Sequence, residues 1–202
     1  MTKFFTILLG VLCLSTVAFA QTNGTTQFGI QVGYNSSSIT SNNLSATFRS
    51  GFNAGVSIEH YFSERWSFKG KVLSDQKGWA DGFFLVSVNN SPIGYATNFD
   101  YIDIPLLANW HFGHTKKWYL NFGPYIGFLT SAKLASDNTD IKSFFNSTDG
   151  GLDLGIGVKF PIAGQIRLFI EYNGQAGVVN INNDSRSTIR NATGALNIGL
   201  TF

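Results

Sequence analysis

Eight segments of the chain alternate apolar residues with polar or small ones, and this pattern constrains the fold more than any other feature. Neighbouring residues of a β-strand point to opposite faces, so a period of two predicts a strand with one apolar face. The predicted strands cover residues 27–34, 52–62, 66–72, 102–111, 118–128, 152–160, 166–173 and 195–202. The sequence therefore predicts an all-β chain.

The connections between these segments alternate in length. Long polar stretches cover residues 35–50, 78–98, 131–149 and 177–188, whereas short turns cover 63–65, 113–117 and 161–165. In antiparallel strands connected up and down, every second connection lies at the same rim, so one rim carries all the long loops. Bacterial outer-membrane barrels have this arrangement, with both termini at the short-turn side. We therefore predict an eight-stranded antiparallel up-and-down transmembrane β-barrel with four long extracellular loops.

The composition agrees with a surface that does not face only water. Charged residues make up 13% of the chain, whereas about a quarter is usual for a soluble domain. A helical protein with several membrane spans is excluded, because each span needs about 20 consecutive apolar residues and only the N-terminal region approaches this. The formal net charge of +2 argues against a strongly basic nucleic-acid binder, so no nucleic-acid partner is expected.

The N-terminal region has the three parts of a secretory signal peptide. Lys3 supplies the early positive charge, an apolar stretch runs from Phe4 to Leu14, and Ala18-Phe19-Ala20 offers a cleavage site. We expect residues 1–20 to be removed and residues 21–202 to form the barrel domain; a retained helical anchor is the alternative. Cys13 would leave with the signal, so thiol catalysis and Cys-ligated metals are not expected.

Alternation alone fits two kinds of barrel. A transmembrane barrel turns its apolar face outward, whereas a soluble lipocalin-like barrel turns it inward. The polar face is rich in glycine, which suits a crowded interior, and carries four acids and four bases. Charges in a narrow lumen must be paired, so this balance indicates an interior network, although an exposed face could show it by chance. The predicted lumen network consists of Glu59, Lys69, Lys71, Asp103, Asp153, Lys159, Arg167 and Glu171.

Aromatic residues collect at the ends of the predicted strands. Rings with an apolar body and a polar edge prefer the membrane–water interface, so two girdles and a contact with outer-membrane lipids are expected. The short-turn girdle contains Phe62, Trp66, Trp110, Trp118 and Phe160. The girdle toward the long loops contains Tyr34, Phe99, Tyr101, Phe128 and Tyr172.

The last predicted strand resembles the signal by which outer-membrane barrels are recognised during assembly. Its apolar positions are Leu196, Ile198, Leu200 and Phe202. Together with the segments 103–107 (DIPLL), 123–127 (GPYIG) and 155–158 (GIGV), it makes the mature chain similar to the PorT-like outer-membrane β-barrel family of Bacteroidetes. The resemblance implies a Gram-negative outer membrane, periplasmic termini and insertion by the barrel-assembly machinery. It implies no single activity, although the family includes a member linked to a secretion and gliding machinery.

Two prolines interrupt the predicted strands. Pro105 and Pro124 each lack the backbone N–H that a central strand donates to its neighbour. We predict bulges or irregular pairing at both positions.

No residue pattern predicts catalysis. His60 is expected at the lipid interface, and His111 and His114 form an H-x-x-H spacing without a third metal ligand nearby. The glycines of residues 150–157 continue as a strand and do not form a phosphate loop. No catalytic residue, metal or cofactor is therefore expected, although a serine-histidine-acid arrangement formed only in the fold remains open.

The function expected from the sequence lies in the loops. Eight strands leave room only for side chains, so no wide pore is predicted. A structural role, or surface interaction with a protein partner through the long loops, is the first hypothesis; a secretion-machinery subunit and a lipid A-modifying enzyme are the alternatives. The loop aromatics are either exposed or packed over the barrel mouth; these are Trp79, Phe83, Phe84, Phe144 and Phe145.

Overall fold

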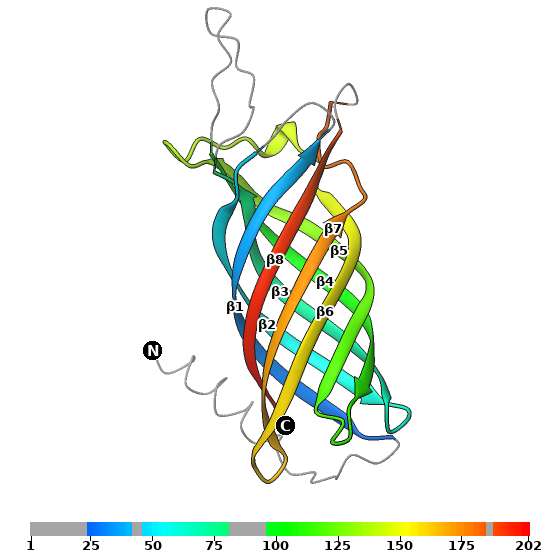
Figure 1. Ribbon diagram of the computed structural model, residues 1–202. Coiled ribbons are helices and arrows are strands. Elements are labelled where there is room, and N and C mark those ends of the chain that lie inside the picture. The colour runs from blue at the N-terminus through cyan, green and yellow to red at the C-terminus, as the bar shows by residue number, and fades with distance from the viewer. Residues whose placement is uncertain (1–23, 42–45, 81–95, 185–187) are drawn as a thin grey trace, which may run out of the picture.

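The computed structural model describes residues 24–41, 46–80, 96–184 and 188–202. Eight strands form a closed barrel in which each strand pairs antiparallel with its chain neighbours, and β1 pairs with β8 to close it (Figure 1). The strands are β1 (Thr26–Ser41), β2 (Arg49–Tyr61), β3 (Trp66–Trp79), β4 (Thr97–Phe112), β5 (Trp118–Leu134), β6 (Thr148–Ala163), β7 (Ile166–Gly177) and β8 (Ile189–Thr201). A short 3₁₀ helix, η1 (Lys142–Phe144), lies between β5 and β6. Within the described ranges no helix has the length and apolarity of a membrane span.

The apolar face of the strands points outward. Along β1, Phe28, Ile30 and Val32 are each about half exposed, whereas Gln27 and Gln31 are buried inside the barrel. The same alternation continues around all eight strands, so the outer surface carries a continuous belt of large apolar side chains. A soluble monomer rarely exposes such an area, whereas a bilayer covers it. The transmembrane arrangement, with its polar face inside, is therefore confirmed over the lipocalin-like one.

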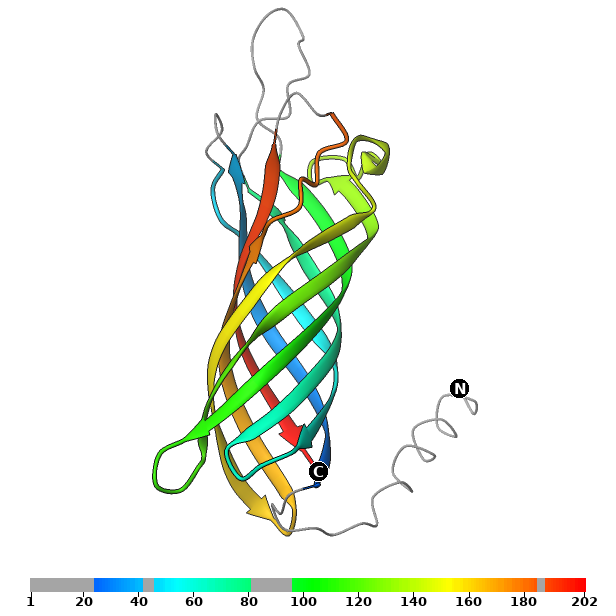
Figure 2. The same cartoon turned by 90° about the vertical axis from the view of Figure 1, so that its right-hand side faces the viewer.

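The strands continue beyond their predicted ends on the side of the long connections. β1 extends to Ser41, β3 to Trp79 and β5 to Leu134. The outward residues there are polar, for example Ser74 and Gln76 on β3, because this part of the barrel stands above the apolar belt. We call this end the long-loop end and the opposite end the short-turn end; Figure 2 shows both.

The two prolines interrupt the ladders without shifting them. Pairing of β3 with β4 stops between Gly70↔Leu106 and Leu73↔Asp103, the stretch that contains Pro105. Pairing of β4 with β5 stops beside Pro124 and resumes in the same register. The irregular pairing is therefore present at both prolines, but the bulges are not there.

Register shifts occur instead at two other places. One lies between Asp100 and Tyr101 in the pairing of β4 with β5, and the other between Pro161 and Ala163 in the pairing of β6 with β7. Both are close to strand ends, where a bulge costs few ladder hydrogen bonds.

One inward glycine makes room for a ring. A Cβ added to Gly157 on β6 would lie 2.3 Å from Cζ of Tyr119 on β5, so no larger residue fits without moving that ring. Tyr119 is fully buried and occupies the lumen beside the charged side chains described below. Glycine on the polar face therefore serves to admit large partners into a narrow interior.

Candidate functional site

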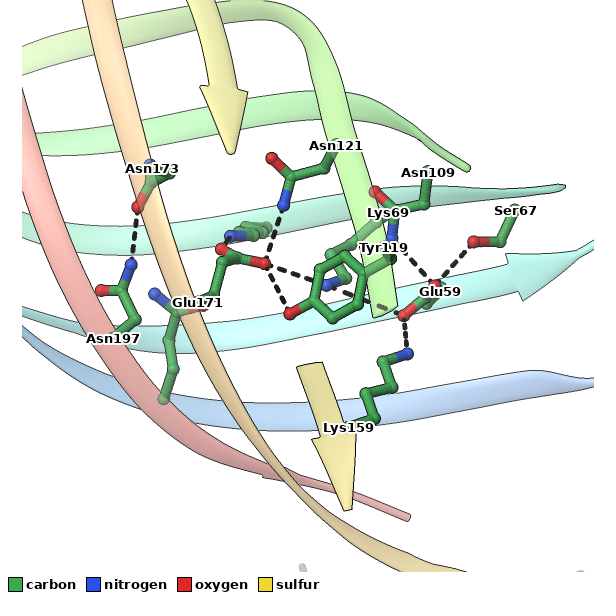
Figure 3. A network of polar contacts seen from close by, with 12 residues as sticks. Glu59, Ser67, Lys69, Asn109, Tyr119, Asn121, Lys159, Glu171, Asn173 and Asn197 are labelled. Carbon is green, nitrogen blue, oxygen red and sulfur yellow. Dashed lines mark hydrogen bonds and ion pairs between the residues drawn. The ribbon is translucent and has the colours of Figure 1, made fainter. Parts of the chain in front are cut away.

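Glu59 on β2 is the centre of a buried network near the short-turn end (Figure 3). Its Oε2 lies 2.6 Å from Nζ of Lys159 and 3.7 Å from Nζ of Lys69. Its Oε1 accepts hydrogen bonds from the Ser67 hydroxyl at 2.6 Å and the Asn109 amide at 2.9 Å. Glu59 is only 1% exposed, so these donors replace water around the carboxylate.

Glu171 on β7 is the second carboxylate of this network. It forms an ion pair with Lys71 and lies 3.5 Å from Nζ of Lys69. Its Oε2 accepts hydrogen bonds from the Tyr119 hydroxyl at 2.9 Å and from the Asn121 amide at 2.8 Å. Lys69 thus lies between the two carboxylates, and the five charged residues form one unit that we call the Glu59–Glu171 network.

His111 on β4 contacts this network from inside the lumen. Its Nε2 lies 3.2 Å from Oε1 of Glu59 and 3.1 Å from the Ser67 hydroxyl. A serine, a histidine and an acid, the residue types of a catalytic triad, are therefore in contact. However, Ser67 and Glu59 both contact Nε2 of His111, whereas in a triad the serine and the acid bind different ring nitrogens. All three side chains are buried and enclosed by Tyr61 and Tyr119, whose ring centroids lie 5.1 Å and 5.7 Å from that of His111. The arrangement fills the lumen.

His60 and His114 lie elsewhere. His60 points outward on β2, where the Thr26 hydroxyl lies 2.9 Å from its Nδ1. His114 is exposed in the turn between β4 and β5. Among the described residues, no group of three or more His, Cys, Asp or Glu side chains is arranged to hold a metal ion.

A second charged cluster, the Lys77 cluster, lies closer to the long-loop end. Nζ of Lys77 lies 2.6 Å from Oδ2 of Asp103 and 3.9 Å from a carboxylate oxygen of both Asp75 and Asp149. It also donates to Oε1 of Gln175 at 2.9 Å. Of these residues the sequence pattern identified only Asp103, and it missed Lys77, Asp75 and Asp149.

Two members of the predicted lumen network have no ion pair within the described part of the chain. Asp153 instead accepts hydrogen bonds from the amides of Asn173 and Gln175, both at 3.2 Å. Arg167 is half-buried at the short-turn end of β7, outside both clusters. The expected pairing of four acids with four bases is therefore wrong in detail, because polar amides and residues beyond the predicted strands supply part of the compensation.

A chain of asparagine side chains extends through the lumen from Asp75 of the Lys77 cluster. The Asn53 amide donates to Oδ1 of Asn35 at 2.6 Å and to Oδ1 of Asn197 at 2.9 Å. The Asn197 amide donates in turn to Asn173 at 2.6 Å, as Figure 3 shows, and the Asn35 amide donates to Asp75. Polar contacts therefore extend along much of the lumen.

Apolar side chains close the lumen at the long-loop end. The connection between β5 and β6 inserts Phe145, whose ring centroid lies 4.7 Å from that of Phe99 and 6.1 Å from that of Trp79. This mouth cluster consists of Ile39, Trp79, Phe99, Tyr101, Leu129, Ala132, Ile141, Phe145, Ile181 and Ile189. The assignment of Phe99 and Tyr101 to an outer girdle was wrong, because both face inward. Phe144 is exposed, whereas Phe83 and Phe84 lie outside the described residues.

The other predicted aromatics lie on the outer surface. The short-turn residues Phe62, Trp66, Trp110, Trp118 and Phe160 are all exposed there. Trp66 and Trp110 are neighbours on β3 and β4, with ring centroids 6.5 Å apart. Tyr34, Phe128 and Tyr172 are exposed toward the long-loop end.

The last strand carries the residues of the predicted assembly signal. Leu196, Ile198 and Phe202 are exposed on the outer face, and Leu200 is half-buried beside them. β8 pairs with both β1 and β7, and the backbones of Phe28 and Phe202 exchange two hydrogen bonds. Barrel closure therefore requires this strand. The predicted signal peptide, residues 1–20, lies outside the described part of the chain.

A closed eight-stranded barrel with an apolar outer belt and a filled polar lumen defines a small transmembrane β-barrel of the outer-membrane class. The chain belongs to the family described as outer membrane protein beta-barrel domain, whose model matches residues 19–200.

Solved structures agree on the fold. The crystal structure of Neisserial surface protein A is 16% identical with a TM-score of 0.52, and the match covers 86% of this chain and 95% of that one. OprG from Pseudomonas aeruginosa is 15% identical with a TM-score of 0.53, covering 91% of this chain and 99% of that one. No curated protein gave a significant match.

Proposed function

We propose that this small outer-membrane barrel is a non-conducting scaffold, with no catalytic activity of its own, that presents its long connections for interaction at the cell surface. The observation that carries the proposal is the filling of the lumen by the Glu59–Glu171 network, the Lys77 cluster and the mouth cluster. A lumen occupied in this way offers no route for solutes, whereas loops on a rigid scaffold are a common place for recognition. Outer-membrane lipids cover the apolar belt.

We further propose that the short turns and both termini face the periplasm of a Gram-negative cell after removal of residues 1–20. The only cysteine of the chain is Cys13, so the expected mature protein offers a clean background for single-cysteine labelling. Ser136→Cys, in the β5–β6 connection, should react with an impermeant maleimide on intact cells. Thr115→Cys, in a short turn, should react only after permeabilisation. The opposite pattern would reverse the orientation.

The surface role is tested by photocrosslinking in living cells. A photoreactive residue at exposed Ser136 should form a discrete adduct with a partner, whereas the same residue at Thr115 serves as the matched control at the other end. Repeating the test in each long connection covers all four. Failure of every loop position to form an adduct would contradict an interaction role and leave a structural one.

Insertion by the barrel-assembly machinery through the β8 signal is part of this proposal. Replacing Phe202 with Ala should lower the amount of heat-modifiable barrel in the membrane while the unfolded precursor accumulates.

The likeness to PorT-like sequences supports a second candidate, an accessory subunit of a secretion or gliding machinery. Copurification with secretion-machinery components, and loss of secretion on deletion, would favour it. A change in lipid A mass on deletion would instead favour an enzyme, which the enclosed position of Ser67, His111 and Glu59 argues against.

A further inference from the structure

Positive charge is concentrated at the short-turn end of the described barrel. Its turns and the first residues of β7 carry Arg65, Lys116, Lys117 and Arg167, with Glu64 as the one acid. At the long-loop end the described charges balance: Arg49, Lys133, Lys142 and Arg190 face Asp100, Asp137, Asp140 and Asp184. The asymmetry indicates that the short-turn rim attracts anions.

An ion pair holds two neighbouring turns of this rim together. Lys116, in the turn between β4 and β5, binds Glu64, in the turn between β2 and β3. The contact lowers the pKa of Glu64, so the acid stays ionised and is neutralised by Lys116. Arg65 and Lys117, both exposed, remain as uncompensated cations beside this pair.

Tryptophans mark the same sector of the barrel as the membrane interface. Arg65 directly precedes Trp66, Lys117 directly precedes Trp118, and Trp110 lies beside Trp66. Three of the four tryptophans of the chain are therefore on β3, β4 and β5 next to the two cations. Tryptophan prefers the headgroup level, which puts Arg65 and Lys117 where lipid phosphates lie.

An apolar groove continues from this point into the belt. Ala108 on β4 forms its floor and is paired with Phe68 on one side and Phe122 on the other. The groove has a volume of about 640 Å³, and its outward side chains also include Leu106 and Pro124. This volume lies within the roughly 300–1,000 Å³ of ligand sites. The cations lie three to five residues from Phe68 and Phe122, or roughly 10–17 Å along a strand.

We propose that this sector binds one phospholipid with an anionic headgroup from the leaflet at the short-turn end. Arg65 and Lys117 contact the phosphate, the tryptophans contact the glycerol region, and one acyl chain lies over Ala108 between the two phenylalanines. Charge complementarity selects the anionic lipid over zwitterionic lipids in the same leaflet. A second apolar groove of about 690 Å³ lies beside Ala54, so it is the two cations and the tryptophans next to them that distinguish this sector.

The test uses the full mature barrel reconstituted in phosphatidylcholine vesicles, with brominated phosphatidylglycerol or brominated phosphatidylcholine added as a minor component. Bromine quenches tryptophan on contact, and three tryptophans line the site. Brominated phosphatidylglycerol should quench at lower mole fraction, and the difference should shrink in high salt. Equal quenching by the two lipids would overturn the proposal without any variant.

Variants locate the site. Arg65→Gln combined with Lys117→Gln should reduce the preference for the anionic lipid by at least about fivefold, the effect of roughly one surface charge. Lys133→Gln combined with Lys142→Gln removes two cations from the other end and should leave it unchanged. Ala108→Leu fills the groove and should weaken binding, whereas Ala54→Leu, on β2 in another sector, should not. A preference that survives the Arg65/Lys117 change in a heat-modifiable, folded barrel would also contradict the proposal.

Discussion

Nζ of Lys159 lies 2.6 Å from Oε2 of Glu59, although the two residues are 100 positions apart in the chain. Lys159 enters the lumen from β6 and Glu59 from β2, strands that are not neighbours in the barrel. The contact therefore crosses the interior instead of following the wall. A barrel whose opposite sides are joined in this way has no open channel at that level.

Removal of the Glu59 charge tests the network. Glu59→Gln keeps the shape of the side chain but leaves Lys159 and Lys69 without one of their carboxylates. Breaking a buried ion pair from one side costs about 3–5 kcal/mol, so the free energy of unfolding should fall by that amount in denaturant titrations of the reconstituted barrel. Glu64→Gln, in the exposed turn, is the matched control and should change it little. An equal loss of unfolding free energy in the two variants would show that the buried network stabilises the barrel no more than an exposed ion pair does.

The Lys77 cluster depends on one ammonium group. Lys77→Met leaves Asp75, Asp103 and Asp149 without the single cation that lies within 4 Å of all three in the described chain. We expect a loss of about 3–5 kcal/mol in the free energy of unfolding. Adding Asp103→Asn should recover part of it, because one of the uncompensated charges is then gone. Strictly additive losses in the double variant would argue against direct coupling.

Gly157 makes room for Tyr119. Gly157→Ala introduces a Cβ 2.3 Å from the ring, so the ring must move from its hydrogen bond with Glu171. Overpacking of this kind costs about 1–3 kcal/mol, visible as a lower unfolding midpoint. Gly174→Ala on β7 is the control, since the nearest atom to its added Cβ is 3.9 Å away. A midpoint that is unchanged in Gly157→Ala would show that the lumen is looser than this contact implies.

Phe145 fixes the β5–β6 connection in the barrel mouth. Phe145→Ala should remove about 3–5 kcal/mol of packing, so the connection should open before the barrel unfolds. Limited proteolysis should then cut within residues 135–147, and the fluorescence of Trp79 should change, because its ring lies 6.1 Å from that of Phe145. Phe144→Ala, next to it but exposed, should do neither. Equal cleavage of the two variants would contradict the assigned role of Phe145.

Alternation predicted the barrel because the bilayer imposes an apolar residue at every second position within the belt. Outside the belt that constraint ends. β3 was predicted to end at Val72, since outward Ser74 and Gln76 are as polar as the inward residues beside them, and so Asp75 and Lys77 were missed. Phe99 and Tyr101 were misplaced for a related reason: an aromatic ring at a strand end fits either a girdle or a capped lumen. The alternation along β4 distinguishes the two cases: Ile102 and Ile104 point outward, so the odd-numbered Phe99 and Tyr101 point inward.

Ion pairing across the lumen could not be predicted from single strands. The pattern identified which side chains face inward, but partners such as Glu59 and Lys159 are determined by strand tilt and register around the closed barrel. His111 was predicted on the polar face of its strand with Asp103 and Asn109, but it was considered only as part of an H-x-x-H spacing and was left out of the lumen network. Its contact with Glu59 depends on the register between strands, which the pattern of a single strand does not give.

Single-channel recording tests the closed lumen most directly. Eight strands enclose only enough space for side chains, and open aqueous channels appear at about 16 strands. The purified, heat-modifiable barrel in a planar bilayer should give no resolved conductance steps in concentrated KCl, and Glu59→Gln should not open a stable channel because Tyr119, Lys69 and the mouth cluster remain. A stable open state of porin size in the wild-type protein would contradict the account.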